Sequence, residues 1–206
     1  MPVAHKSKRA VVSEFRSAEI LEAARRVFAR SGFEGATVER IAEAAGVAKG
    51  TVYLYFPSKR EIYLAALRQG MERLIGEMRR NMDAVPAPAA KLRAFVETRV
   101  RYAEQNRDLV KIYHSEFGNV GPAHLDKVCR SLFLEQVKML EQVIAEAAAA
   151  GQIRPLGAEP AAFTILEMIR GLIVRRVFGW SRQSANNDVD FLFDMIWKGL
   201  AGCTGS

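Results

Sequence analysis

The stretch AGVAKGTVYLYFPSKREI, Ala45 to Ile62, decides the fold of this chain. In its middle, hydroxyl-bearing residues alternate with apolar ones at the two-residue period of a β-strand; they are Thr51, Tyr53 and Tyr55. A lone strand has no partner for its backbone N–H and C=O groups, and the sequence offers no second candidate strand. Gly46 and Pro57 instead bracket a gap that fits a helix over residues 49–56. We therefore predict a short helix here and an all-α fold.

Two amphipathic helices are predicted ahead of this stretch. SAEILEAARRVFARSGFEG carries apolar residues at helical spacing, with Ser17 as its N-cap and Gly32 as its end. TVERIAEAAG follows, with Thr37 as the N-cap and Gly46 as the stop. Each helix thus has a start signal and a stop signal of its own.

The order of these helices predicts a helix-turn-helix. Two short helices joined by a tight turn that contains a glycine define this motif. Val52 and Phe56, four residues apart, would anchor the second helix on the core, and Leu54 is also interpreted as a packing residue. Ser58 then opens a capping box, SKRE, that starts a long helix over residues 59–82.

The remaining face of the second helix carries residue types that suit the major groove of DNA. Lys49 can neutralise a phosphate or reach a guanine, and Thr51 can hydrogen-bond a base edge or touch a thymine methyl group. Gly50 lets the backbone approach closely. Tyr53 and Tyr55 bring ring hydroxyls within reach of phosphates, although either ring could instead be a half-buried core residue.

The distribution of charge favours a polyanion partner for the first part of the chain. The net charge is +7, and residues 1–80 carry 15 Lys and Arg against 9 Asp and Glu, while the remainder carries 15 against 14. Thr37 and Lys59 stand at predicted helix N-termini, where backbone N–H groups favour a phosphate. A basic terminus is also common on proteins that bind no nucleic acid, so the charge alone leaves both interpretations open.

The segment ILEAARRVFARSGFEGATVERIAEAAGVAKGTVYLYFPSKREIYLAAL, Ile20 to Leu67, resembles the DNA-binding domain of the tetracycline-repressor (TetR/AcrR) family of bacterial transcriptional regulators. The resemblance covers the first third closely, and the all-helical remainder agrees in outline. It implies a homodimer that binds a near-palindromic DNA operator, with an N-terminal three-helix head and a C-terminal body that binds ligand and dimerises. It also implies a repressor that responds to a small-molecule effector.

Roles carry over from this resemblance position by position. The implied phosphate contacts are Thr37, Tyr55 and Lys59, and the implied groove contacts are Lys49, Gly50, Thr51 and Tyr53. The chain departs from many relatives at Ala48, where a serine commonly caps the recognition helix. Alanine cannot cap, so we expect the helix to lose roughly 1 kcal/mol there together with one phosphate contact.

The predicted division of the chain is a basic N-terminal arm over 1–16, a helix-turn-helix domain over 17–66 and a helical body over 67–206. The arm could follow DNA into the minor groove or be only a solubilising tail. DAVPAPAA is the clearest linker, and further helices are predicted beyond it over residues 89–105, 107–116, 122–150, 160–178 and 189–201.

The body offers candidates for an effector pocket and for a dimer interface. Pocket candidates on the middle helices are Phe95, Tyr102, Tyr113, His114, Phe117, Phe133 and Met139, although aromatic residues at helical spacing are also typical of a plain core. Arg99, Arg101 and Arg107 could receive an acidic ligand or form a solvated face. The last two helices are apolar nearly all round, so we expect them to be buried on several sides. The family resemblance implies that they pair with their copies in a second subunit; the alternative is that they complete a monomer core.

An enzyme and a helical protein–protein adaptor are the rival functions. The sequence shows no Ser–His–acid set, phosphate-binding glycine loop or dinucleotide fingerprint. His124, Asp126 and Cys129 have metal-capable groups at a spacing unlike that of a helical zinc site, and we expect no metal and no cofactor. The two cysteines are interpreted as reduced thiols of a cytoplasmic protein, and no apolar run is long enough to span a membrane. An adaptor would leave the pattern from Lys49 to Lys59 unexplained.

Overall fold

The structure is a computed structural model, and it describes residues 8–119 and 127–201. Over these residues the chain forms helices and no strand, which confirms the all-α fold. The helices are α1 Lys8–Gly35, α2 Val38–Ala45, α3 Lys49–Tyr55, α4 Lys59–Asp83, α5 Pro88–Gln105, α6 Arg107–Asn119, α7 Lys127–Ala149, α8 Ala158–Val177 and α9 Ala185–Ala201. None of the described helices is both long enough and apolar enough to cross a membrane.

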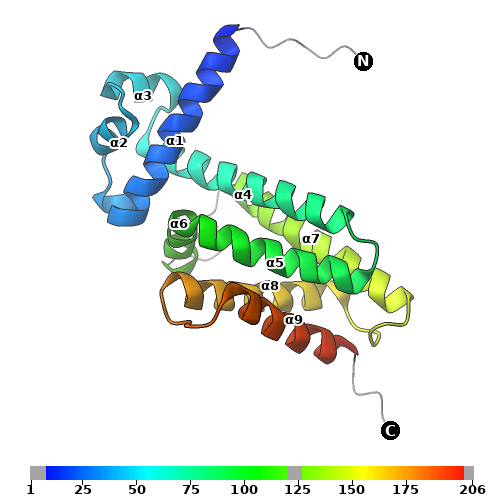
Figure 1. Cartoon of the computed structure of the whole chain (residues 1–206). Helices are drawn as coiled ribbons and strands as arrows, with labels where there is room; N and C mark the ends of the chain where they lie inside the picture. The colour runs from blue at the N-terminus through cyan, green and yellow to red at the C-terminus, as the bar shows by residue number, and fades with distance from the viewer. Residues whose placement is uncertain (1–7, 120–126, 202–206) are drawn as a thin grey trace.

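Helices α1 to α3 form a head at one end of the molecule, and α5 to α9 form a body (Figure 1). Within the head, the chain changes direction at the two glycines that the sequence predicts as helix ends. Gly32 interrupts α1 with a φ of 67°, and Gly46 ends α2 in the left-handed region with a φ of 66°. Glycine reaches these angles without the strain that a Cβ atom would add. Helix α3 confirms the choice of helix over strand, and Ala48 ahead of it makes no side-chain capping hydrogen bond, as predicted.

The start of α1 differs from the prediction. The sequence predicts Ser17 as the N-cap, but the helix begins at Lys8, so Ser17 lies inside it. The last part of the predicted arm, from Lys8 to Arg16, is therefore helical. A serine that precedes an apolar stripe has the same local sequence whether the helix starts there or continues through it, so the cap signal is ambiguous.

Helix α4 connects the head to the body and begins at the predicted cap. The backbone N–H of Glu61 donates to the Ser58 hydroxyl at 3.2 Å, which satisfies one of the free N–H groups at the helix start. From there α4 runs out of the head and along α5 and α7 (Figure 1). One continuous helix therefore spans both hydrophobic cores.

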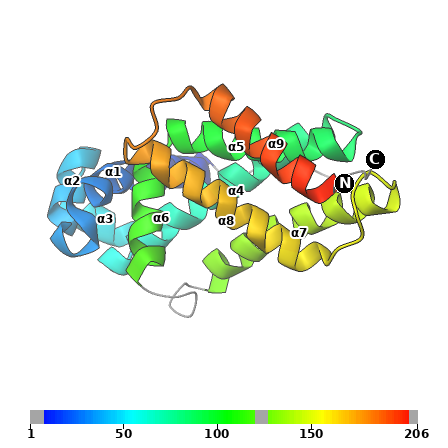
Figure 2. The same ribbon diagram turned by 90° about the horizontal axis from the view of Figure 1, so that it is seen from below.

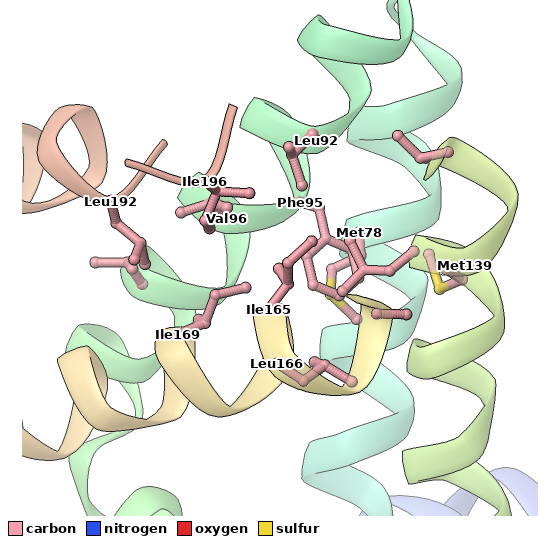
Figure 3. Packing of buried hydrophobic residues seen from close by; sticks show 14 of the residues in the cluster. Met78, Leu92, Phe95, Val96, Met139, Ile165, Leu166, Ile169, Leu192 and Ile196 are labelled. Carbon is pink, nitrogen blue, oxygen red and sulfur yellow. The ribbon is translucent and has the colours of Figure 1, made fainter. Parts of the chain in front are cut away.

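The core of the body lies between α4, α5, α7, α8 and α9. Figure 3 shows Phe95 of α5 among Met78 of α4 and Ile165 of α8, and Phe95 is completely buried. On the other side, Leu192 and Ile196 of α9 lie against α5 and α8. The described part of the predicted helix 122–150 begins at Lys127, and its expected start at Pro122 falls outside the described residues.

The head is not packed as a separate unit. Its hydrophobic cluster includes Tyr102 of α5 and Leu109 and Ile112 of α6, all from the body. At Gly70, α4 packs tightly against α6, because an added Cβ would lie 2.3 Å from a Leu109 methyl carbon. A movement of α6 would therefore displace residues of α4 and of the head that pack against it.

Candidate DNA-reading face and effector cavity

Helix α3 is fixed to the head by one side and exposed on the other. Val52 is completely buried and Phe56 nearly so, as predicted for the anchoring pair. In front of α3, the backbone N–H of Arg40 donates to the Thr37 hydroxyl at 3.3 Å, so Thr37 caps α2. The exposed side of α3 thus has a fixed orientation relative to the start of α2.

The predicted contact residues lie on this exposed side. Lys49, Gly50 and Tyr53 are exposed, while Thr51 and Tyr55 are half-buried at its margin. A Cβ added to Gly50 would meet no atom within 4 Å, and the helical position needs no positive φ. The fold itself therefore does not require glycine here, which is consistent with a need for space outside the chain.

Leu54 corrects one interpretation of the sequence. Its residue type predicts a packing role, but 83% of it is exposed, the largest exposure among the described large hydrophobic residues. In a helix, two residues correspond to about 200°, so Leu54 faces away from the buried Val52. We call Lys49, Gly50, Thr51, Tyr53 and Leu54 the reading face.

Lys49 is held in place by α2. Its ammonium forms an ion pair with Glu39, and it lies 5.8 Å from the centre of the Tyr53 ring. The hydrogen bond with Glu39 raises the pKa of Lys49, and the same bond lowers the pKa of Glu39. Both groups are solvent-exposed, so a phosphate could replace Glu39 as the partner of Lys49 at small cost.

Lys59 has a structural role that was not predicted from the sequence. Its ammonium donates to the carbonyl oxygens of Phe33 at 2.7 Å, Ala36 at 3.1 Å and Glu34 at 3.5 Å. It also lies 4.4 Å from the centre of the Phe33 ring. Lys59 therefore satisfies the carbonyl groups at the end of α1. A phosphate contact by this ammonium, which stays a prediction, would compete with those bonds.

A cavity of about 80 Å³ lies in the body beneath the head, between α4, α5, α6, α7 and α8. Its wall is mainly apolar, and its polar residues are Arg99, Tyr102, His114, Gln136 and Arg170. The Tyr102 hydroxyl donates to the Gly70 carbonyl at 2.8 Å, and burial raises the pKa of Tyr102. This cavity is the natural candidate for an effector site because it adjoins the contact between Gly70 and Leu109.

The structure divides the seven predicted pocket residues. Tyr102 and His114 line the cavity, whereas Phe95 and Met139 lie in the hydrophobic core and Phe133 packs near Phe163. The side chains of Tyr113 and Phe117 lie outside the described residues. Gln136 and Arg170 also line the cavity but were not predicted from the sequence. They lie on separate helices, and no local sequence pattern indicates that the two side chains come close together.

Tyr63 of α4 connects α6, which forms part of the cavity wall, to the head. The Tyr63 hydroxyl of α4 donates to the Ile112 carbonyl of α6 at 3.2 Å, while the Tyr63 ring contacts Phe28 in the head edge to face. Arg25 of α1 is also buried at this junction and forms an ion pair with Glu22. Burial, together with repulsion from Arg73, lowers the pKa of Arg25. A displacement of α6 would reach the head through the two contacts of Tyr63.

Helix α9 and the segment that follows α8 carry exposed apolar residues. Phe178, Trp180, Phe191 and Met195 are all exposed, and a Cβ added to Gly171 would meet no atom within 4 Å. Figure 2 shows both helices nearest the viewer, on the outer face of the body. We call these five residues the outer apolar face.

A buried ion-pair network fixes the turn between α8 and α9. Asp188 is 1% exposed and is paired with Arg175 at 3.0 Å and Arg176 at 2.5 Å, and Arg176 is also paired with Glu104 of α5. Burial alone would raise the pKa of Asp188, but the hydrogen bonds from Arg176 and Ser181 and the charge of Arg175 outweigh it and lower the pKa.

No group of three metal-capable side chains occurs among the described residues. His124 and Asp126, two members of the cluster considered from the sequence, fall outside them, as does the side chain of Cys129.

Comparisons with known protein families match both parts of the chain. Residues 20–66 match the family described as bacterial regulatory proteins, tetR family. Residues 86–174 match the family described as tetracyclin repressor-like, C-terminal domain. The first match covers the helix-turn-helix, and the second covers α5 to α7 and most of α8.

Individual relatives agree with these families. The chain is 29% identical to the HTH-type transcriptional repressor KstR2 of Mycolicibacterium smegmatis over 137 residues, which is 66% of this chain and 67% of the relative. The fold is similar to that of FadR from Bacillus subtilis in complex with stearoyl-CoA, with a TM-score of 0.80, 21% identity and coverage of 89% and 98% of the two chains. It is also similar to AibR in complex with isovaleryl coenzyme A and operator DNA, with a TM-score of 0.74, 21% identity and coverage of 88% and 98%.

Proposed function

This chain belongs to the tetR family of bacterial regulatory proteins and is a DNA-binding transcriptional regulator, and from that premise we propose the details of how it works. It is a repressor that binds a near-palindromic operator as a homodimer and is released by a small-molecule effector. Residues 17–66 read DNA, and residues 67–206 hold the effector and the dimer interface. The orientation of α3, with Val52 buried and the reading face outward, is the observation that carries this proposal.

DNA recognition by α3 combines polar and apolar contacts. Lys49 and Thr51 meet base edges, Gly50 permits close approach of the backbone, and Tyr53 supports Lys49 through its ring. Leu54, the most exposed residue of the helix among the large hydrophobic ones, contacts thymine methyl groups. An apolar side chain on such an otherwise polar surface gains free energy only when a partner covers it.

Phosphate contacts come from the margin of the same surface. Thr37 lies at the start of α2, and Tyr55 is half-buried beside the buried Phe56. The N-terminus of α4 adds backbone N–H groups near Lys59. These contacts set the position of the head on DNA without selecting a sequence.

The homodimer forms through the outer apolar face on α8 and α9. Phe191 and Met195 are one helical turn apart on α9, and both are exposed in the single chain. Gly171 leaves room for a second helix to approach α8 closely. The buried Asp188 network keeps the two helices in one arrangement, so the surface is preformed for association. Such helices pair as a four-helix bundle.

Effector binding acts through a population shift. In this structure Leu109 lies against Gly70, and the Tyr63 hydroxyl donates to the Ile112 carbonyl. An effector that prefers a displaced α6 favours a displaced α4, and α4 carries the head. The same coupling requires operator DNA to weaken effector binding by the same factor.

Selection from a random pool of duplexes with the full chain tests DNA recognition. We expect an enriched near-palindrome, whose affinity falls linearly with the logarithm of salt concentration. Thr51→Ala should change the enriched sequence, whereas Tyr55→Phe should weaken binding to all duplexes alike. Lys138→Ala, at an exposed position of α7, is the matched control and should change neither. Enrichment of no sequence would contradict the proposal.

A further inference from the structure

An acidic residue of α2 is paired with the lysine of the reading face. Helix α3 itself carries no acidic residue, but the carboxylate of Glu39, in the first turn of α2, forms an ion pair with the Lys49 ammonium. We propose that Glu39 is a specificity-determining residue, which holds Lys49 as a hydrogen-bond donor to guanine and withholds its charge from phosphates. This inference rests on the proposed DNA-reading role of Lys49 and adds the residue that makes that role selective.

The carboxylate of Glu39 is fixed by the start of α2. The hydrogen bond from Lys49 lowers the pKa of Glu39 most, and hydrogen bonds from its own backbone N–H and from the Thr37 hydroxyl lower it further. Thr37 is also the residue that caps α2. The positive end of the helix dipole favours a carboxylate in this first turn. Glu39 is therefore ionised at neutral pH, and several donors set its direction.

Lys49 can contact a base without leaving Glu39. Its ammonium is bound to the Glu39 carboxylate on one side and lies 5.8 Å from the centre of the Tyr53 ring on another. An ammonium has three N–H donors, so the bond to Glu39 leaves donors for the O6 and N7 atoms of a guanine. The guanine edge carries no net charge and does not repel Glu39. Of the two roles that the sequence leaves open for Lys49, the ion pair favours the base contact.

A phosphate contact by Lys49 gains little while Glu39 is present. More than half of each of the two side chains is exposed, so a phosphate would replace a carboxylate in similarly aqueous surroundings. The exchange would also leave the Glu39 carboxylate without Lys49, close to the negative DNA backbone. Repulsion that acts against an unwanted complex is one of the two ways to raise specificity. Glu39 therefore lowers the affinity for non-specific DNA more than the affinity for the operator.

Lys59 provides the contrasting case on the same head. Its ammonium donates to the carbonyl oxygens of Phe33 at 2.7 Å and Ala36 at 3.1 Å. These acceptors are uncharged, so they do not compensate the positive charge of Lys59, which can attract DNA from a distance. The pair of Lys49 and Glu39 has no net charge. Lys49 thus acts at contact with a base, not as part of the long-range attraction.

Salt titrations of the full chain with Glu39→Gln test this assignment. The probes are a random-sequence duplex and the operator that wild type selects. The free Lys49 should raise the affinity for the random duplex about threefold. The slope of log affinity against log salt should become steeper by about 0.9, the value for one phosphate. Operator affinity should rise less, so the ratio of the two affinities should fall. Glu43→Gln is the matched control, because it removes the same charge at an exposed position one turn further along α2 and should leave the slope unchanged.

Lys49→Met shows whether Glu39 acts through Lys49. In the Lys49→Met background, Glu39→Gln should leave the random-duplex affinity and the salt slope unchanged, because no ammonium is released. An equal gain in affinity in both backgrounds would mean that Glu39 repels DNA by itself, and it would overturn the proposal. An unchanged salt slope in Glu39→Gln would overturn it as well.

A guanine analogue measures the base contact itself. Replacement of one operator guanine by 7-deazaguanine, which lacks the N7 acceptor, should weaken binding by wild type but not by Lys49→Met. The loss at that position should be smaller in Glu39→Gln, where a phosphate can capture Lys49. A purely structural role of Glu39 in α2 would leave the loss unchanged, and so would contradict the proposal, as would the absence of any such guanine. If wild type selects no operator, the proposed DNA reading fails, whereas the random-duplex titrations still decide whether Glu39 restrains Lys49.

Discussion

Substitution of Gly70 by alanine tests the packing contact between α4 and α6, which connects the body with the head. The new Cβ atom would lie 2.3 Å and 2.8 Å from the two Leu109 methyl carbons, closer than real contacts allow. The Leu109 side chain would have to move, and because it lines the cavity, part of that movement is into the cavity. Gly70→Ala therefore imitates an effector that presses on α6.

Gly76→Ala is the matched control on the same helix. Its added Cβ would meet only the end of the Arg80 side chain at 3.5 Å, an ordinary contact. Both substitutions gain the same helix propensity of roughly 0.8–1.0 kcal/mol. Overpacking opposes this gain at Gly70 alone, by about 1–3 kcal/mol. The free energies of unfolding of the two variants should thus differ by about 1–3 kcal/mol, with Gly76→Ala more stable than wild type.

Urea unfolding and operator titration measure the two consequences. Gly70→Ala should also weaken operator binding without any effector, while Gly76→Ala should leave it unchanged. Leu109→Ala combined with Gly70→Ala should restore part of the lost stability relative to the sum of the single substitutions, since the clashing methyl groups are gone. Equal stability of Gly70→Ala and Gly76→Ala would refute the reasoning.

Three further substitutions test other parts of the molecule. Asp188→Asn should lower the free energy of unfolding by about 1–3 kcal/mol, because Arg175 and Arg176 lose the buried carboxylate of Asp188 while Arg176 keeps only its pair with Glu104. The folded-state pKa of Asp188 is lowered, so in wild type this stabilisation should be present above about pH 4 and be lost as the pH falls through the folded pKa. In urea unfolding, Asp188→Asn should lack this acid dependence. Leu54→Ala should weaken operator binding about three- to fourfold for each thymine methyl group that the side chain no longer covers. Wild type should lose the same factor on an operator in which deoxyuridine replaces that thymidine. Leu54→Ala should bind the deoxyuridine operator no more weakly than it binds the unmodified one. Phe191→Ser should shift the chain toward monomer in sedimentation velocity, whereas Lys138→Ser on α7 should not.

Local signals account for the part of the fold that could be predicted. The caps at Thr37 and Ser58 and the stop at Gly46 lie within a few residues of the helices they bound, so a short window of sequence contains them. The alternating pattern around Tyr53 could be assigned to a helix because a lone strand cannot satisfy its backbone. The signal failed at Ser17, where helix α1 continues through a residue that looks like its cap.

The candidate sites were less predictable because they depend on contacts between distant segments. Leu54 looks like a core residue by type, but the packing of Val52 and Phe56 turns it outward. Lys59 looks like a free cation in the sequence, but the end of α1 lies beside it and binds its ammonium. Which way a short helix faces is decided by the rest of the head, not by the helix.

The sequence by itself determined that this chain is helical and that it has a helix-turn-helix, since periodicity, caps and glycines act over one or two turns of chain. Only the tertiary structure decided where the candidate effector cavity lies and which polar residues line it. Arg99, Gln136 and Arg170 come from three different helices, and their meeting depends on how α5, α7 and α8 pack. Packing of this kind is set by the sum of many weak contacts between residues far apart in sequence, which no local pattern records.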